Sequence, residues 1–74
     1  MTSGLVKHSV TIAGHRTSIS LEPEFWSALR EIAKRNNRSL GSEIAVIDAE
    51  RSTRNLSSAI RVHVLKDALA HIKD

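Results

Sequence analysis

Polar and hydrophobic residues alternate strictly along the segment from residue 16 to residue 21. A period of two is typical of a strand with one solvated face and one buried face. The solvated positions are Arg16, Ser18 and Ser20, and the buried positions are Thr17, Ile19 and Leu21. The segment therefore predicts a strand that presents a row of hydrogen-bonding side chains on one side and needs a core on the other.

The extended pattern reaches back to residue 7, so residues 7–21 are predicted to form a strand or a hairpin after a flexible tail at residues 1–6. A type II′ turn at Gly14-His15 would fold this segment back on itself. The resulting register pairs Ile12 with Thr17, Val10 with Ile19 and His8 with Leu21. One face of the hairpin is then mostly apolar. A single long strand, and a disordered arm followed by one short strand, are the alternatives.

Three helices are predicted beyond the extended segment, over residues 23–36, 40–51 and 56–72. Pro23 suits the first helical position, where its missing N–H has no cost. Asn36-Asn37 ends the first helix, because asparagine tolerates left-handed conformations. Ser39 is a good N-cap for the second helix, and Asn55 or Ser57 caps the third.

Each predicted helix has an apolar side that needs a core. These positions are Phe25, Leu29, Ile32 and Ala33 in the first helix, Leu40, Ile44, Val46 and Ile47 in the second, and Leu56, Ile60, Val64, Leu65, Ala68, Leu69 and Ile72 in the third. Trp26 lies beside the first stripe and is expected to pack where two chains meet. The pattern as a whole predicts one α+β domain over residues 1–74.

Length and composition restrict the class of protein further. A chain of 74 residues buries a modest fraction of its surface, so oligomerisation is expected. The net charge of +3 favours an anionic partner such as nucleic acid. The absence of cysteine excludes disulfides and fits a reducing cytoplasm. No apolar run approaches the roughly 18 residues that a membrane span needs.

The sequence offers no basis for catalysis or for a metal site. No pair among the four histidines has the i, i+4 spacing of a helical zinc site, and no cysteine assists them. Neither a G-x-S-x-G motif nor a phosphate-binding glycine loop is present. We therefore expect a protein that is not an enzyme and that has no cofactor and no bound metal.

The stretch from Arg16 to about Arg51 resembles the ribbon-helix-helix family of bacterial DNA-binding proteins. The similarity comprises a strand, Pro23 at the helix start, the spacing of Leu29, Ile32 and Ala33, and the run from Asn36 to Ile44 between and into the next two helices. The segments Val10–Ser18 and Asn55–Arg61 resemble an uncharacterised bacterial subfamily of the same fold. In this resemblance the third helix is an addition to the minimal fold.

The resemblance implies an intertwined homodimer, in which one strand from each chain forms an antiparallel ribbon that enters the DNA major groove. By position, the side chains facing the bases would be those of Arg16, Ser18 and Ser20. The start of the second helix, Ser39, Leu40 and Gly41, would bind a phosphate together with Arg38, since a helix N-terminus presents free N–H groups. The implied function is a sequence-specific transcriptional repressor or autoregulator.

Three features depart from the family pattern. Serine discriminates between bases less well than arginine, asparagine or glutamine, so the specificity of the ribbon should be modest. Arg38 and Glu43 could form part of a buried ion-pair cluster, but Ile47 occupies its third position. Two hairpins side by side would span roughly 14 Å at a strand spacing of about 4.8 Å, whereas the major groove is about 12 Å wide.

Two other functions remain open at this level. The third helix could bind a partner protein, as the C-terminal segment of an antitoxin does. The serine-rich ribbon is also compatible with a dimer that has lost DNA binding.

Overall fold

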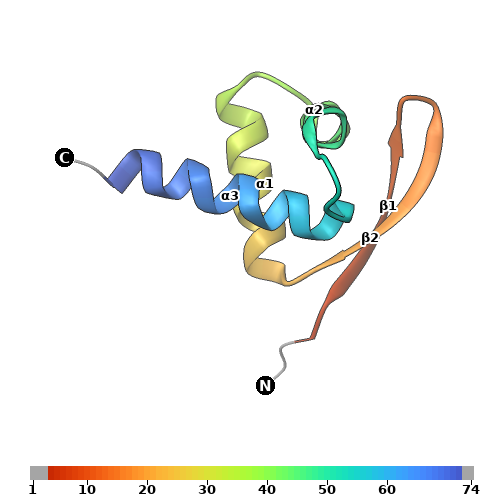
Figure 1. The fold of residues 1–74 in the computed structure, drawn as a ribbon, viewed down its shortest axis with the longest axis horizontal. Helices are drawn as coiled ribbons and strands as arrows, with labels where there is room; N and C mark the ends of the chain where they lie inside the picture. The colour runs from red at the N-terminus through yellow and green to blue at the C-terminus, as the bar shows by residue number, and fades with distance from the viewer. Residues whose placement is uncertain (1–3, 73–74) are drawn as a thin grey trace.

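The computed structural model describes residues 4–72, which form a β-hairpin on one side of a cluster of three helices (Figure 1). The elements are β1 (Val6–Ile12), β2 (His15–Leu21), α1 (Pro23–Arg35), α2 (Leu40–Glu50) and α3 (Leu56–Ile72). This α+β arrangement, with a hairpin and a third helix, confirms the predicted fold class. Among the described residues, no helix combines the length and the apolar character that crossing a membrane requires.

The hairpin exists, but its predicted turn and register are wrong. The turn residues are Ala13 and Gly14, with φ values of 50° and 83°, and not Gly14-His15. Positive φ at both central positions is the type I′ geometry, whose twist matches that of the paired strands. Ile12 therefore lies opposite His15, and every other partner moves by two residues, so that His8 faces Ile19. Because side chains repeat every two residues, this shift leaves each one on its predicted face.

The turn provides a test of local strain. Alanine at positive φ is disfavoured, whereas asparagine is the preferred first residue of a type I′ turn. We expect Ala13→Asn to raise the free energy of unfolding by roughly 0.5–1 kcal/mol. Ala13→Val should instead destabilise the protein, since a β-branched residue resists this conformation. Urea denaturation monitored by circular dichroism measures both, and equal midpoints for the two variants would contradict the assigned turn.

The ends of the helices follow from local chemistry. α1 begins at Pro23 as predicted and ends at Arg35, one residue before the predicted end. Asn37 takes a left-handed conformation with φ of 57°, and the N–H of Arg38 bonds the Ala33 carbonyl at 2.9 Å. This is a Schellman end, which turns the chain sharply into α2. The Ser39 hydroxyl caps α2 by accepting a hydrogen bond from the Ser42 N–H at 3.0 Å.

The core lies between the inner face of the hairpin and the three helices. α2 packs against β1, α3 packs against β2, and the helices pack against one another. The buried apolar side chains are Ile12, Ile19, Leu21, Trp26, Leu29, Ile32, Ala33, Ile44, Ile47, Ala59, Ile60 and Val64. Phe25 is only half-buried, and the predicted core positions Leu65, Ala68, Leu69 and Ile72 of α3 are exposed. The C-terminal half of α3 extends away from the hairpin (Figure 1), and these four side chains have no cover from the described residues.

Trp26 belongs to the core of its own chain, which corrects the expectation that it packs between two chains. Its side chain is 1% exposed, and its Nε1–H donates to the Val6 carbonyl at 2.9 Å. Its ring meets the His8 ring edge-on, with 4.5 Å between the centroids. Trp26 therefore fastens the start of β1 to α1.

Candidate functional site

The outer face of the hairpin carries polar side chains alone. Its residues are Lys7, Ser9 and Thr11 on β1 and Arg16, Ser18 and Ser20 on β2, and Ser20 is the one that is half-buried. No helix of the described chain covers the other five. The face combines two cationic side chains with four hydroxyl groups and has no carboxylate, so it suits an anionic surface rich in hydrogen-bonding groups.

The edge of β2 that faces away from β1 is a second open feature. In an antiparallel hairpin closed at Ile12 and His15, the backbone groups of alternate residues point away from the partner strand. These residues are Arg16, Ser18 and Ser20. The Ser57 hydroxyl of α3 donates to the Ser20 carbonyl at 3.1 Å, which places α3 beside this edge. The rest of this edge, at Arg16 and Ser18, can pair with another strand.

The N-terminus of α2 lies beside β1 and not beside β2. A Cβ atom on Gly41 would lie 3.3 Å from the Thr11 carbonyl oxygen, so glycine here permits the close approach of α2 to β1. Leu40 is half-buried against the core. The N–H groups of Leu40 and Gly41 occupy the first two helical positions and have no partner within the helix. The structure therefore places the predicted phosphate-binding segment at the outer margin of the hairpin.

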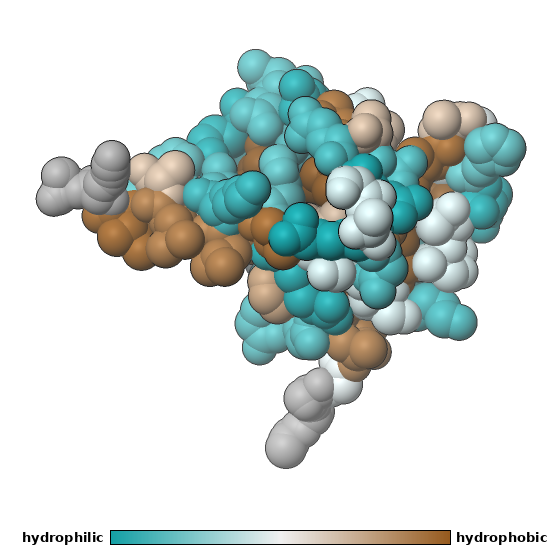
Figure 2. All heavy atoms as spheres, in the orientation of Figure 1, coloured by the Kyte–Doolittle hydropathy of each residue, from teal (hydrophilic) through white to brown (hydrophobic). Residues whose placement is uncertain are grey.

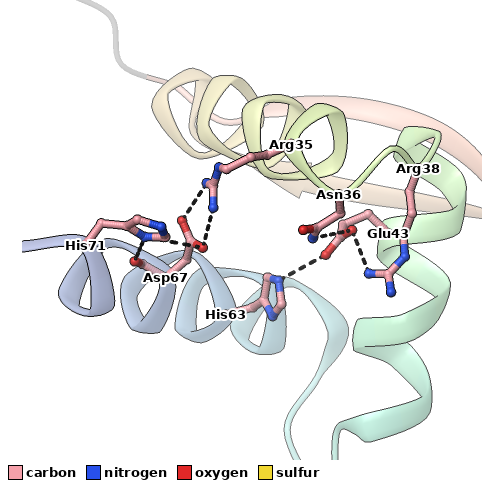
Figure 3. A network of polar contacts seen from close by, with 7 residues as sticks. All are labelled: Arg35, Asn36, Arg38, Glu43, His63, Asp67 and His71. Atoms are coloured by element: carbon pink, nitrogen blue, oxygen red, sulfur yellow. Dashed lines mark hydrogen bonds and ion pairs between the residues drawn. The ribbon is translucent and has the colours of Figure 1, made fainter.

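Arg38 is held in place by a buried carboxylate. Its guanidinium donates to Glu43 Oε1 at 3.0 Å; Glu43 is 1% exposed, whereas Arg38 is 41% exposed. Asn36 also donates to Oε1, at 3.3 Å, and His63 Nε2 of α3 lies 3.2 Å from Oε2 (Figure 3). The predicted ion pair is thus present, and α3 supplies the further partner that Ile47 cannot.

The pKa of Glu43 reflects a competition between burial and its partners. Burial raises the pKa of this carboxyl, but the hydrogen bonds from Arg38 and Asn36 and the charges of Arg38 and His63 outweigh it. The net pKa therefore lies below the ordinary value, and the carboxylate stays ionised at neutral pH. A charged Glu43 fixes the orientation of Arg38, whose exposed part lies next to the N-terminus of α2.

A second polar cluster fastens α3 to α1. Arg35 donates to both carboxylate oxygens of Asp67, at 3.1 and 2.9 Å, and these bonds hold the pKa of Asp67 below its ordinary value (Figure 3). His71 Nδ1 lies 3.8 Å from Asp67 Oδ1. The Arg35–Asp67 pair and the contact of His63 with Glu43 together orient α3 against α1 and α2.

His63 and Asn36 were not foreseen as partners of Glu43. His63 follows the buried Ile60 by three residues and precedes the buried Val64 by one, so it lies on the inward side of α3. A polar residue on the inward side of a helix indicates a buried polar contact, but the sequence does not show that the partner of His63 is Glu43. The outer face also includes Lys7, Ser9 and Thr11 of β1, because these residues lie opposite Ser20, Ser18 and Arg16 in the hairpin.

Comparison with known proteins gives one match. A family model described as "Ribbon-helix-helix domain" matches residues 5–68. The match includes both strands and α3 as far as residue 68, so the hairpin and most of the third helix lie within the matched domain. Neither a curated protein nor a solved structure matches the chain.

Proposed function

The chain belongs to the ribbon-helix-helix family, a DNA-binding and regulatory family, and from this premise we propose that it binds double-stranded DNA as a homodimer and represses transcription. The proposal includes repression of its own gene. The observation that carries it is the outer face of the hairpin, which is polar, exposed and free of the chain's own helices. Members of the family generally bind DNA as dimers, and the open edge of β2 is where a second chain can pair.

In this proposal the two β2 strands lie at the centre of the major groove, and their outer side chains meet the base edges. Arg16 is the residue with the greatest power to discriminate, because a guanidinium can bond two acceptors of guanine at once. Ser18 and Ser20 can donate to or accept from several bases, so they add affinity and little selectivity. Recognition then depends on Arg16 in each half of a two-fold symmetric site.

The hairpin sets a limit on how deeply the sheet can enter. Four strands would span roughly 14 Å, more than the groove width of about 12 Å. We therefore place the β1 strands at the two margins of the groove, where Lys7, Ser9 and Thr11 face the phosphate backbones. The side chains of β2 reach the bases, and those of β1 supply contacts that do not depend on sequence.

The N-terminus of α2 would bind a backbone phosphate at the same margin. The N–H groups of Leu40 and Gly41 point out of the helix start, and Ser39 caps it. Arg38, oriented by Glu43, would add a charged hydrogen bond to the same phosphate. The proximity of Gly41 to Thr11 supports this placement, because it joins the phosphate-binding segment to the strand at the groove margin.

Replacing Arg16 with alanine tests the base contact. Arg16→Ala should weaken binding to the specific operator by about 1–3 kcal/mol, because a bidentate contact to guanine is lost. Fluorescence anisotropy with an operator fragment selected from random sequence measures the affinity. The same variant should bind random duplex almost as well as the wild type.

Arg30→Ala is the matched control, because Arg30 is an exposed arginine of α1 and its loss changes the net charge equally. It should leave operator binding nearly unchanged. Affinity of the wild type should also fall steeply as salt increases. Absence of duplex binding at low salt would contradict the proposed function and would indicate a dimer that does not bind DNA.

A further inference from the structure

Helix α3 has apolar residues on two opposite sides, and within residues 4–72 the chain covers one of them and leaves the other exposed. Ala59, Ile60 and Val64 lie in the core. On the other side, Val62 is half-buried, while Leu65, Leu69 and Ile72 are 55%, 56% and 70% exposed. Figure 2 shows hydrophobic surface along the C-terminal half of this helix. An apolar stripe at helical spacing is typically packed against another surface, so this second stripe lacks its cover within the described residues.

The spacing of the exposed stripe is that of a helix-to-helix seam. Val62, Leu65, Leu69 and Ile72 are separated by three, four and three residues, which is the a/d pattern of two heptads. The stripe itself has no charged residue. Asp67, on the other side of the helix, is already paired with Arg35 of the same chain. The stripe can therefore pack against an identical stripe through apolar side chains alone, with Arg61 and Lys66 at its two margins.

The stripe adjoins the open edge of β2. Its first part lines an apolar groove with Phe25 and Arg61, and the Arg61 guanidinium lies 5.9 Å from the centre of the Phe25 ring. Arg61 also lines the depression along the β2 edge, together with Ser18 and Ser20. One partner molecule could thus cover the strand edge and the helix stripe without a break between them.

The packing of the helices under the sheet decides which helix meets that partner. α2 packs against β1, whereas α3 packs against β2. If β2 pairs with β2 of a second copy, the two-fold axis passes beside β2, and α3 is the sheet-packed helix closest to it. A strand pair through the open part of the β2 edge, at Arg16 and Ser18, is short, and we expect it to bury less than the roughly 1,200–2,000 Å² of a stable interface. A second layer of contacts under the ribbon would supply the missing apolar area.

We propose that the α3 stripe packs against the α3 stripe of a second copy of this chain, beneath the paired β2 strands. This inference rests on the homodimer of the proposed function and adds its second layer. The third helix then does two things at once: it closes the core of its own chain through Ile60 and Val64, and it joins the two chains through Leu65 and Leu69.

Sedimentation equilibrium of the full chain tests the proposal with the variant Leu65→Gln/Leu69→Gln. Because both side chains are exposed within one chain, the variant should keep its helical content and its fold. We expect a dimer for the wild type and a dissociation constant at least tenfold higher for the variant. Ala70→Gln, an exposed change on the same helix away from the stripe, should leave the dimer unchanged.

Crosslinking gives an independent readout, because the chain has no cysteine and a single new one can form a disulfide only between chains. Leu69→Cys should oxidise to a covalent dimer much faster than Glu31→Cys, which lies on the exposed side of α1. A wild-type dimer that the double glutamine variant leaves equally tight overturns the α3 contact but keeps the ribbon dimer. A monomeric wild type overturns both, while duplex binding by anisotropy reports separately on the DNA-binding function.

Discussion

Replacing Trp26 with alanine is expected to lower the free energy of unfolding by about 3–5 kcal/mol. The side chain is 1% exposed and belongs to the same buried core cluster as Leu21, Leu29 and Ile60, so its removal leaves a large cavity in the core. The Nε1–H bond to the Val6 carbonyl is lost as well, and β1 is released from α1. A domain of this size has a total stability of roughly 4–11 kcal/mol, so the variant should lose a large part of its stability at 25 °C.

Urea denaturation followed by circular dichroism measures this loss, since the variant has no tryptophan left for fluorescence. Trp26→Phe separates the contributions, because it keeps an aromatic ring and removes the hydrogen bond; it should cost clearly less than Trp26→Ala. Ser27→Ala is the neighbouring surface control and should change stability by no more than about 0.5 kcal/mol. A cost below about 1 kcal/mol for Trp26→Ala would show that the ring is not packed in the core of its own chain.

Replacing Arg38 with methionine should have the second largest effect on stability. At neutral pH it leaves the Glu43 carboxylate buried with Asn36 and His63 as its remaining partners. A buried acceptor that loses its partner costs about 1–3 kcal/mol, and the partial exposure of Arg38 keeps the value within this range. Arg30→Met, which removes an equal charge from an exposed position, should cost no more than about 0.5 kcal/mol.

The pH dependence of this variant has a defined sign. In the wild type, the pKa of Glu43 lies below its ordinary value of 4.5, so its stabilising contribution is present above that pH and disappears as the pH falls through the lowered pKa. Arg38→Met removes two of the causes that lower the pKa and leaves the burial that raises it. The stability difference between the two proteins should therefore shrink as the pH falls through the pKa of Glu43, first in the variant and then in the wild type. A difference that is constant from pH 7 to pH 3.5 would contradict the assigned ion pair.

Trp26→Ala and Arg38→Met should affect DNA binding in different ways. Trp26→Ala removes binding through unfolding, so its effect should disappear when the folded fraction is taken into account. Arg38→Met keeps a folded fraction that can be measured and removes a proposed phosphate contact. Its residual loss of duplex affinity should be the same for operator and random DNA, because phosphate contacts carry no sequence information.

Much of the fold could be predicted because local chemistry decides it. Pro23 and Asn37 accept backbone conformations that start and end a helix, and Ser39 caps the next one through its own hydroxyl. The alternation at residues 16–21 fixes which side chains face the core, whatever strand lies alongside. For this reason Arg16, Ser18 and Ser20 lie on the predicted outer face, although the predicted register was wrong by two residues.

The turn and the strand register were predicted wrongly because two turn types have a similar local conformational energy here. Glycine at residue 14 fits the first position of a type II′ turn and the second position of a type I′ turn, so the sequence leaves the choice open. The observed turn lets Val6 pair with Leu21, and the Val6 carbonyl then accepts the bond from Trp26. This long-range contact favours a register that puts Ala13 at positive φ, an outcome that local preference alone disfavours.

What the sequence determined by itself is therefore the three helices with their ends to within a residue and the outward row of Arg16, Ser18 and Ser20, because these depend on neighbours a few residues away. Only the tertiary structure decided that Trp26 lies in the core of its own chain, that His63 joins Arg38 at Glu43, and that the apolar positions of α3 divide between a covered and an uncovered side. The physical reason is the same in each case. A side chain's partner comes from another element, and periodicity shows that a face needs cover without showing which surface provides it.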